Sequence, residues 1–258
     1  AILLIMIVLA IFANVIAPYG FDEQDYRNTF QTSSSEHLLG TDNLGRDIFS
    51  RLLYGARVSL RVGIISVGIG MAVGGLIGAL AGFYGGKVDM VLMRIMDVFL
   101  AIPPIILAIS ICAALGPGLT NTMIAVGISS VPTYARILRS SVMSIKQVEF
   151  VEAARAIGAG DARVIGKHVI PNSLAPLIVQ GSMGIARSII SAANLSFIGL
   201  GIQPPNPEWG AMLSAGRSYF REYPHMVIWP GIAIMFAVLS FNLLGDGLRD
   251  ALDPKLKR

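Results

Sequence analysis

Long stretches without charged side chains constrain this chain more than any other feature. No Asp, Glu, Lys or Arg occurs in residues 1–21, 62–86, 98–135, 169–186, 188–207 or 223–245. An α-helix needs roughly 20 apolar residues to cross a hydrocarbon core of about 30 Å. The six windows therefore predict an all-α integral membrane protein with six transmembrane helices. Charged residues make up 14% of the chain, against about 25% in soluble domains, which argues against an ordinary soluble enzyme.

We place the spans at about 1–17, 58–82, 90–115, 119–138, 174–199 and 227–246 of a single transmembrane domain covering residues 1–258. Proline and glycine residues punctuate the breaks between them. The first segment has no basic leader, so we interpret it as a membrane anchor rather than a signal peptide. Because the first residue is Ala1 and not Met, we expect further residues upstream.

The positions of the cationic side chains predict the orientation, because cytoplasmic loops carry an excess of Lys and Arg. One set of connections holds twelve of these residues: Lys87, Arg94, Arg136, Arg139, Lys146, Arg155, Arg163, Lys167, Arg249, Lys255, Lys257 and Arg258. The other set holds six: Arg27, Arg46, Arg51, Arg57, Arg217 and Arg221. We therefore place residues 83–89, 139–173 and the C-terminal tail in the cytoplasm, with outer loops at 18–56 and 201–226. The net charge of +4 then reflects cytoplasmic loops, and no nucleic-acid partner is expected.

Two features of the spans predict helix geometry. Gly70, Gly74 and Gly78 repeat every four residues, a spacing that lets two membrane helices approach closely. We interpret this ladder as a packing face rather than a ligand site. The Pro103-Pro104 pair should kink the third span, as happens both in pathway-lining helices and in simple packing.

The long cytoplasmic loop 139–173 is predicted to fold into two short helices. Ser144 followed by Gln147 fits a capping box, and the apolar residues that follow recur every three positions as an amphipathic stretch: Ile145, Val148, Val151, Ala154 and Ile157. Gly158 is a typical C-terminal stop. Asp161 can cap a second helix over 162–168, which Pro171 should end.

This loop resembles the EAA loop of ATP-binding-cassette importer permeases. The sequence EAARAIGAGDARVIGKHVIPN covers residues 152–172, and Glu152, Ala153, Ala154, Gly158 and Pro171 match the family pattern. His168 and Ile170 replace the usual Ile and Leu, a change that the peptide-transporter branch tolerates at His168.

Three further stretches resemble the C-type permease of dipeptide, oligopeptide, glutathione and nickel importers. They are HLLGTDNLGRDIFSRLLYGARVSL at 37–60, LSFIGLGIQPPNPEWGAML at 195–213 and FNLLGDGLRDALDPKLKR at 241–258. The last stretch is most similar to dipeptide permeases. The resemblance implies the type I importer permease fold and a multi-pass location in the bacterial inner membrane.

The resemblance also implies a mechanism and partners. The EAA helices of the family sit in a cleft of a cytoplasmic ATPase, so the expected coupling residues here are those of the loop: Glu152, Ala153, Ala154, Gly158, His168, Pro171 and Asn172. The expected partners are a homologous second permease in a heterodimer, two ATPase subunits, an extracytoplasmic peptide-binding protein and membrane lipid.

The chain has no nucleotide-binding loop, metal cluster or catalytic triad, so it is not expected to be an enzyme or to bind a cofactor. ATP and Mg would lie on the ATPase subunits. Without the motif, Glu152 would be a solvated helix charge near Arg155 or Lys146.

Charges within or beside the spans supply further candidates. Arg187 lies mid-span, where an unpaired cation is costly, so it either forms a structural pair or faces a substrate pathway together with Ser191 and Asn194. Arg94 and Asp97 are spaced for a local ion pair. Arg57 and Arg61 are expected to reach the lipid headgroups.

The outer loops 18–56 and 201–226 combine charge with aromatic residues and are predicted to receive substrate from the binding protein. We expect Glu208 and Glu222 to contribute to this charge-sensitive docking. The alternative, which applies most clearly to Trp209, is an aromatic belt at the membrane interface.

Three functions remain open at this stage. A permease subunit for di- or oligopeptides is favoured, and a permease for nickel chelates or glutathione is the alternative within the family. A stand-alone secondary transporter is the third possibility. It is disfavoured because Asp97 is the only acid inside a predicted span apart from Asp246 at the very end of the sixth, whereas such transporters use mid-span proton-relay carboxylates.

Overall fold

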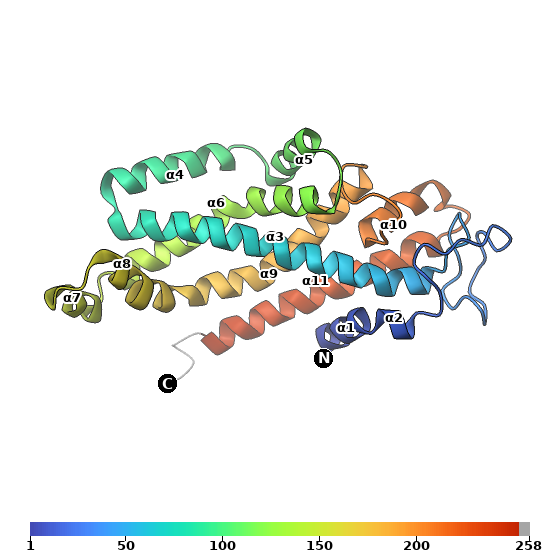
Figure 1. Cartoon of the computed structure of the whole chain (residues 1–258), viewed down its shortest axis with the longest axis horizontal. Coiled ribbons are helices and arrows are strands. Elements are labelled where there is room, and N and C mark those ends of the chain that lie inside the picture. The colour runs from blue at the N-terminus through green and yellow to red at the C-terminus, as the bar shows by residue number, and fades with distance from the viewer. Residues whose placement is uncertain (253–258) are drawn as a thin grey trace.

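A computed structural model describes residues 1–252, and every regular element in that part of the chain is a helix. In chain order they are α1 (Ile2–Ile11), α2 (Ala13–Ile16), α3 (Ile48–Tyr84), α4 (Gly86–Leu100), α5 (Pro104–Leu115), α6 (Leu119–Ile145), α7 (Glu149–Ala156), α8 (Asp161–Arg163), a π-helix (Val164–Val169), α9 (Ile170–Phe197), α10 (Trp209–Gly216), a 3-10 helix (Arg217–Tyr219) and α11 (His225–Leu252). The long helices α3, α6, α9 and α11 run along the longest axis of the molecule (Figure 1). The predicted cytoplasmic residues Lys255, Lys257 and Arg258 lie outside the described part.

Three helical stretches are long and apolar enough to cross a membrane, namely α3, the continuous run Asp161–Phe197, and α11. The pair α4 and α5 passes the same criterion together, as one span bent by 85°. The first predicted span is divided between the short helices α1 and α2, and the fourth corresponds to α6. The expected all-helical membrane fold is thus present, while α3 starts ten residues before the predicted span at 58.

The glycine ladder of α3 packs directly on α6. A Cβ atom at Gly74 would lie 2.4 Å from the carbonyl oxygen of Val131, and one at Gly78 would lie 2.2 Å from that of Ala135. Real Cβ atoms do not approach backbone this closely, so a larger residue would push the two helices apart. The predicted packing face is confirmed.

The third predicted span is broken rather than gently kinked. Helix α4 ends at Leu100, helix α5 begins at Pro104, and their axes differ by 85°. Pro103 adopts an extended backbone conformation before the second helix, as expected for a residue that precedes proline. The double proline therefore produces an elbow between α4 and α5 (Figure 1).

Residues 18–47 form a compact outer segment that caps the start of α3. Asp42 forms an ion pair with Arg46 (2.7 Å) and a longer one with Arg51 (3.7 Å). Asp47 accepts a hydrogen bond from the Ser50 amide (2.7 Å) as the helix N-cap and also contacts the His37 ring (3.0 Å). Buried charges need partners, and these side chains supply partners for one another. The motif at 37–60 is therefore explained by its structural role in capping the start of α3.

Helix α10 corrects the prediction for Glu208 and Trp209. Both residues are 1% exposed, so Glu208 is not available for docking and Trp209 is not part of an interfacial belt. The Glu208 carboxylate accepts hydrogen bonds from the amides of Gly210 (2.9 Å) and Ala211 (2.8 Å), and the Trp209 indole donates to the Leu52 carbonyl (3.2 Å). Burial raises the pKa of Glu208 in spite of these bonds. Glu222 remains exposed.

Two predicted roles of charged side chains are also wrong. Asp97 pairs with Arg136 of α6 (2.6 Å) rather than with Arg94, because the neighbouring helix is within reach of the carboxylate. Arg57 donates to the carbonyls of Ala10 and Ile11 and to the Asn14 side chain. It thereby binds the end of α1 to α3 rather than reaching for lipid headgroups.

Candidate functional site

The loop with the EAA-like sequence projects from the end of the helical bundle opposite the outer segment (Figure 1). Its helix α7 has two distinct faces. Val151 is 0% exposed and Ala154 is 6% exposed against the bundle, whereas Glu152 and Ala153 face outward. Ile157 is 87% exposed, so the predicted apolar face stops at Ala154. Of the two motif alanines, Ala153 lies on the outer face and Ala154 packs inside.

The N-terminal boundary of α7 differs from the predicted capping box. Ser144 belongs to the last turn of α6, and its hydroxyl donates to the Ser140 carbonyl (3.3 Å). Helix α7 starts at Glu149 after Val148, without a side-chain cap. Helix α6 continues past the predicted cap because neither Pro nor Gly occurs between 133 and 146 to stop it.

The predicted helix stop at Gly158 is confirmed. Gly158 has φ +84°, its amide donates to the Arg155 carbonyl (2.9 Å), and the Ala159 amide donates to the Ala154 carbonyl (3.1 Å). This pattern satisfies the last carbonyls of α7 and requires a left-handed residue. Glycine adopts that conformation without steric cost.

Replacing Gly158 with Ala should therefore destabilise the loop, whereas replacing Gly160 should not. A Cβ atom at either position would meet no atom within 4 Å, but Gly160 has an ordinary φ of −70°. The expected penalty at Gly158 is about 1 kcal/mol. Faster proteolysis or amide exchange of residues 149–163 in Gly158→Ala, with Gly160→Ala as the matched control, would measure it. Equal protection in both variants would contradict this account.

The second half of the loop is the start of a long helix, not a separate short one. The chain is helical from Asp161 to Phe197, with Gly160 rather than Asp161 at the N-cap. Pro171 does not end the helix. It lies directly after the π-helix Val164–Val169, where the continuous helix changes from π to α geometry. Asn172 donates to the His168 carbonyl (2.6 Å) across this junction.

Several contacts fasten α7 to the bundle. The Arg155 guanidinium lies over the Phe83 ring at 4.9 Å from its centroid, and the Lys146 ammonium donates to the Gly82 carbonyl (2.8 Å) at the end of α3. Val151 shares a buried cluster with Val164 and Val169 of the π-helix. These contacts place α7 against the end of α3 and against the helix that continues as α9.

Glu152 has no ion-pair partner in this arrangement within residues 1–252. The described ion pairs join His37 to Asp47, Arg46 and Arg51 to Asp42, Arg136 to Asp97, and Arg139 to Asp89. The two cations expected beside Glu152, Lys146 and Arg155, are engaged with α3 instead. The outward carboxylate is thus free to meet a basic side chain of another protein.

A polar cavity of about 190 Å³ lies between α5, α6 and α9. Arg187 and Ser191 of the predicted pathway set line it, and Asn194 does not. Gln180 also lines the cavity. In the amide orientation that satisfies its neighbours, its oxygen accepts hydrogen bonds from both terminal nitrogens of Arg187 (2.9 and 3.2 Å). Gln180 was not among the residues expected from the sequence, although it lies seven residues, about two helical turns, before Arg187 and therefore on the same helix face.

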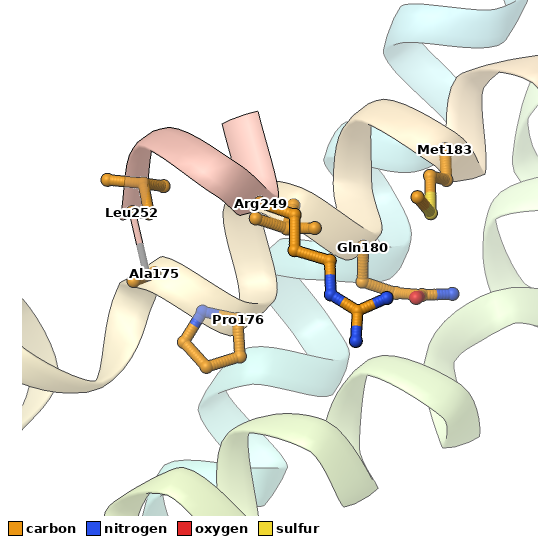
Figure 2. Close-up of a pocket in the computed structure, with 7 residues that line it drawn as sticks. Ala175, Pro176, Gln180, Met183, Arg249 and Leu252 are labelled. Atoms are coloured by element: carbon orange, nitrogen blue, oxygen red, sulfur yellow. The ribbon is translucent and has the colours of Figure 1, made fainter. Parts of the chain in front are cut away.

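A second groove of about 390 Å³ lies between the first half of α9 and the end of α11. Figure 2 shows Arg249 of α11 extending toward Gln180, with Pro176 and Leu252 on the same groove. Gln180 therefore lines both spaces.

Comparison with known proteins places this architecture among membrane transport components. Residues 74–258 match the family described as "Binding-protein-dependent transport system inner membrane component", and residues 1–33 match the "N-terminal TM domain of oligopeptide transport permease C". The chain is 50% identical over 255 residues to the glutathione transport system permease protein GsiD of Pectobacterium atrosepticum, with 98% of this chain and 85% of that protein covered. It is 49% identical over 251 residues to the dipeptide transport system permease protein DppC of Alkalihalophilus pseudofirmus, with 97% and 83% covered.

Solved structures share the fold at lower sequence identity. A chain of the inward-facing MetNI methionine ABC transporter, in its CY5 native crystal form, gives a TM-score of 0.66 at 20% identity and covers 80% of this chain and 98% of that chain. An amino acid ABC transporter crystallised with histidines gives 0.61 at 19% identity, covering 79% and 95%. The bundle α3–α11 is therefore arranged as in these transporters.

Proposed function

Because the chain belongs to the family of binding-protein-dependent transport system inner membrane components, we propose that it forms half of a translocation pathway for di- and oligopeptides. As a member of this family it is a multi-pass permease subunit of an ATP-binding-cassette importer in the bacterial inner membrane. Separate ATPase subunits hydrolyse ATP, and the permease works with a second permease and a binding protein.

The finer assignments are part of the proposal. We assign a heterodimer with a homologous permease, two ATPase subunits that carry ATP and Mg, and a peptide-binding protein on the outer side. The match of the first 33 residues to an oligopeptide permease domain and the dipeptide permease relative support a peptide substrate. Glutathione is the second candidate, because the relative that transports it is equally similar. Nickel chelates are the third candidate substrate.

The observation that carries this proposal is the form of the EAA-like loop. It is an exposed helical projection with an unpaired outward carboxylate, and it is joined to α3 and α9 by buried contacts. A partner that moves α7 would thereby move two membrane helices together. We assign coupling to Glu152, Ala153, Gly158 and the π-helix junction at His168, Pro171 and Asn172, with Ala154 holding α7 against the bundle.

The substrate assignment can be tested by ATP-driven uptake into proteoliposomes that hold the complete complex and its binding protein. Labelled alanyl-alanine, glutathione and a nickel–histidine complex are offered separately. We expect the dipeptide to accumulate fastest. Exclusive accumulation of glutathione or nickel would replace the peptide proposal within the same family, and accumulation without ATP would contradict an importer of this kind.

Glu152→Ala should lower transport-coupled ATP hydrolysis by about tenfold or more, because it removes one partner of a charge pair that becomes buried on docking. Glu149→Ala is the matched control, since Glu149 is an exposed acid in the same first turn of α7. ATPase activity stimulated by the loaded binding protein is the measurement. A similar loss in both variants would indicate a general charge effect, and no loss in either would remove Glu152 from the coupling contact.

A further inference from the structure

The cavity between α5, α6 and α9 has a lining that distinguishes it from the apolar interior of the bundle. Its walls carry hydroxyl groups from two helices, with one cation: Ser129, Ser130, Thr133 and Tyr134 from α6, and Ser188, Ser191 and Arg187 from α9. The hydroxyls of Ser129 and Ser130 donate to the Val126 (2.9 Å) and Gly127 (2.7 Å) carbonyls of their own helix. The Ser130 oxygen packs against α3, because a Cβ atom at Gly70 would lie 2.1 Å from it, so Ser129, Thr133, Ser188 and Ser191 supply the other hydroxyl groups of the lining.

Tyr134 forms a fixed wall of this space. A Cβ atom at Gly184 would lie 2.0 Å from the Tyr134 hydroxyl oxygen, so the ring reaches the backbone of α9 only because residue 184 is glycine. A Cβ atom at Gly70 of α3 would likewise lie 2.9 Å from the same ring. The cavity is therefore held open by packing between three helices.

Arg187 is the only charged residue in this lining, and its partner is neutral. The Gln180 amide oxygen accepts from both terminal guanidinium nitrogens, and none of the ion pairs within residues 1–252 includes Arg187. Gln180 orients the guanidinium but leaves its charge uncompensated. A membrane-embedded cation of this kind is expensive and marks a pathway or a counter-ion site.

We propose that Arg187 and Gln180 form a transient binding site for the carboxylate of the transported peptide. The guanidinium supplies a planar pair of donors that matches a carboxylate, and the hydroxyl oxygens opposite are acceptors for the peptide ammonium or amides. The volume of about 190 Å³ is below the roughly 300–1,000 Å³ of pockets for drug-sized ligands, so the space fits one end of a short peptide. This inference rests on the proposed peptide function.

Equilibrium binding to the purified complex without its binding protein tests the site directly. The probes are radiolabelled alanyl-alanine and its C-terminal amide, which differ in the carboxylate alone. We expect wild type to bind the acid about tenfold or more tightly than the amide, as for a hydrogen bond to a charged group. Arg187→Gln should abolish the difference, and Arg61→Gln, which removes an exposed arginine of α3 away from the cavity, should retain it.

A second variant covers the case in which Arg187→Gln does not assemble. Ser191→Glu places a carboxylate four residues from Arg187 on the same helix face, where it can pair with the guanidinium. It compensates the cation internally and should assemble, yet it should also abolish the preference for the acid. Full preference in Ser191→Glu would overturn the proposal.

The remaining outcomes separate this site from the function on which it rests. Wild-type complex that takes up alanyl-alanine but binds acid and amide equally refutes the carboxylate site and leaves the peptide function standing. Wild type that takes up no peptide refutes the peptide function itself. If Arg187→Gln dissociates the two permeases while Ser191→Glu keeps both assembly and the acid preference, Arg187 pairs with an acid of the second permease and the proposal is wrong.

Discussion

A valine at Gly78 is expected to prevent stable folding of the permease in the membrane. The first side-chain carbon would lie 2.2 Å from the Ala135 carbonyl oxygen and 2.9 Å from the Arg139 amide nitrogen. Both are backbone atoms of α6, which cannot move aside as a flexible side chain could. Overpacking costs up to about 3 kcal/mol in a core, and the separated helices would also lose the neighbouring contacts of the ladder. The yield of monodisperse protein and its thermal midpoint in detergent would measure the effect.

Gly68→Val provides the matched control in the same helix. A Cβ atom at Gly68 meets nothing within 4 Å, so this variant adds the same β-branched side chain without a clash. We expect it to purify and melt like wild type. If Gly78→Val were as stable as Gly68→Val, the close approach of α3 and α6 would not be needed for the fold.

Ile157→Asp is expected to prevent the ATPase subunits from copurifying with the permease. Ile157 is 87% exposed beside the outer face of α7, an unusual position for a large apolar side chain unless a partner covers it. In a desolvated cleft an apolar anchor carries much of the binding energy, and an aspartate there would be buried without a partner at a cost of several kcal/mol. Quantitative pull-down through a tagged permease is the measurement.

Leu38→Asp is the control for this prediction, because Leu38 is 54% exposed on the outer segment at the opposite end of the molecule. It should retain the ATPases in full. Ile157→Leu should retain them as well, since it keeps the apolar volume. Stoichiometric copurification with Ile157→Asp would show that α7 docks through other residues.

Local patterns predicted several features correctly. The stop at Gly158 and the break near Pro103 follow from the backbone preferences of a few neighbouring residues, and the glycine spacing of α3 predicted a close approach of another helix. The size of the break does not follow from them, because the 85° angle also depends on how α5 packs against α6. The resemblance singled out the EAA-like loop, and its apolar spacing predicted that Val151 and Ala154 are buried, whereas the exposure of Ile157 appeared only with the structure.

Several predictions about charged side chains failed because they depend on segments distant in sequence. Asp97 binds Arg136, which is 39 residues away, although a closer arginine has suitable helical spacing. Arg51 near the start of α3 is buried beside Asp42. The helix therefore begins in a charged stretch, ahead of the apolar window from which the span was predicted. Glu208 resembles a surface acid in sequence, and only the packing of α10 shows that it is a buried N-cap. Charge sign and local spacing cannot identify such partners.

The outer segment has a consequence for how the chain is made. Its Thr41 carbonyl contacts the His225 ring (3.2 Å), 184 residues later at the start of α11, and Leu52 receives the Trp209 indole from 157 residues later. In the predicted orientation a nascent chain exports Asp42 and Arg46 early, whereas Met212 and Met226, which line a space with them, are synthesised much later. Contacts of such long sequence separation form late. The cap on α3 is therefore completed only after α10 and the start of α11 have been synthesised.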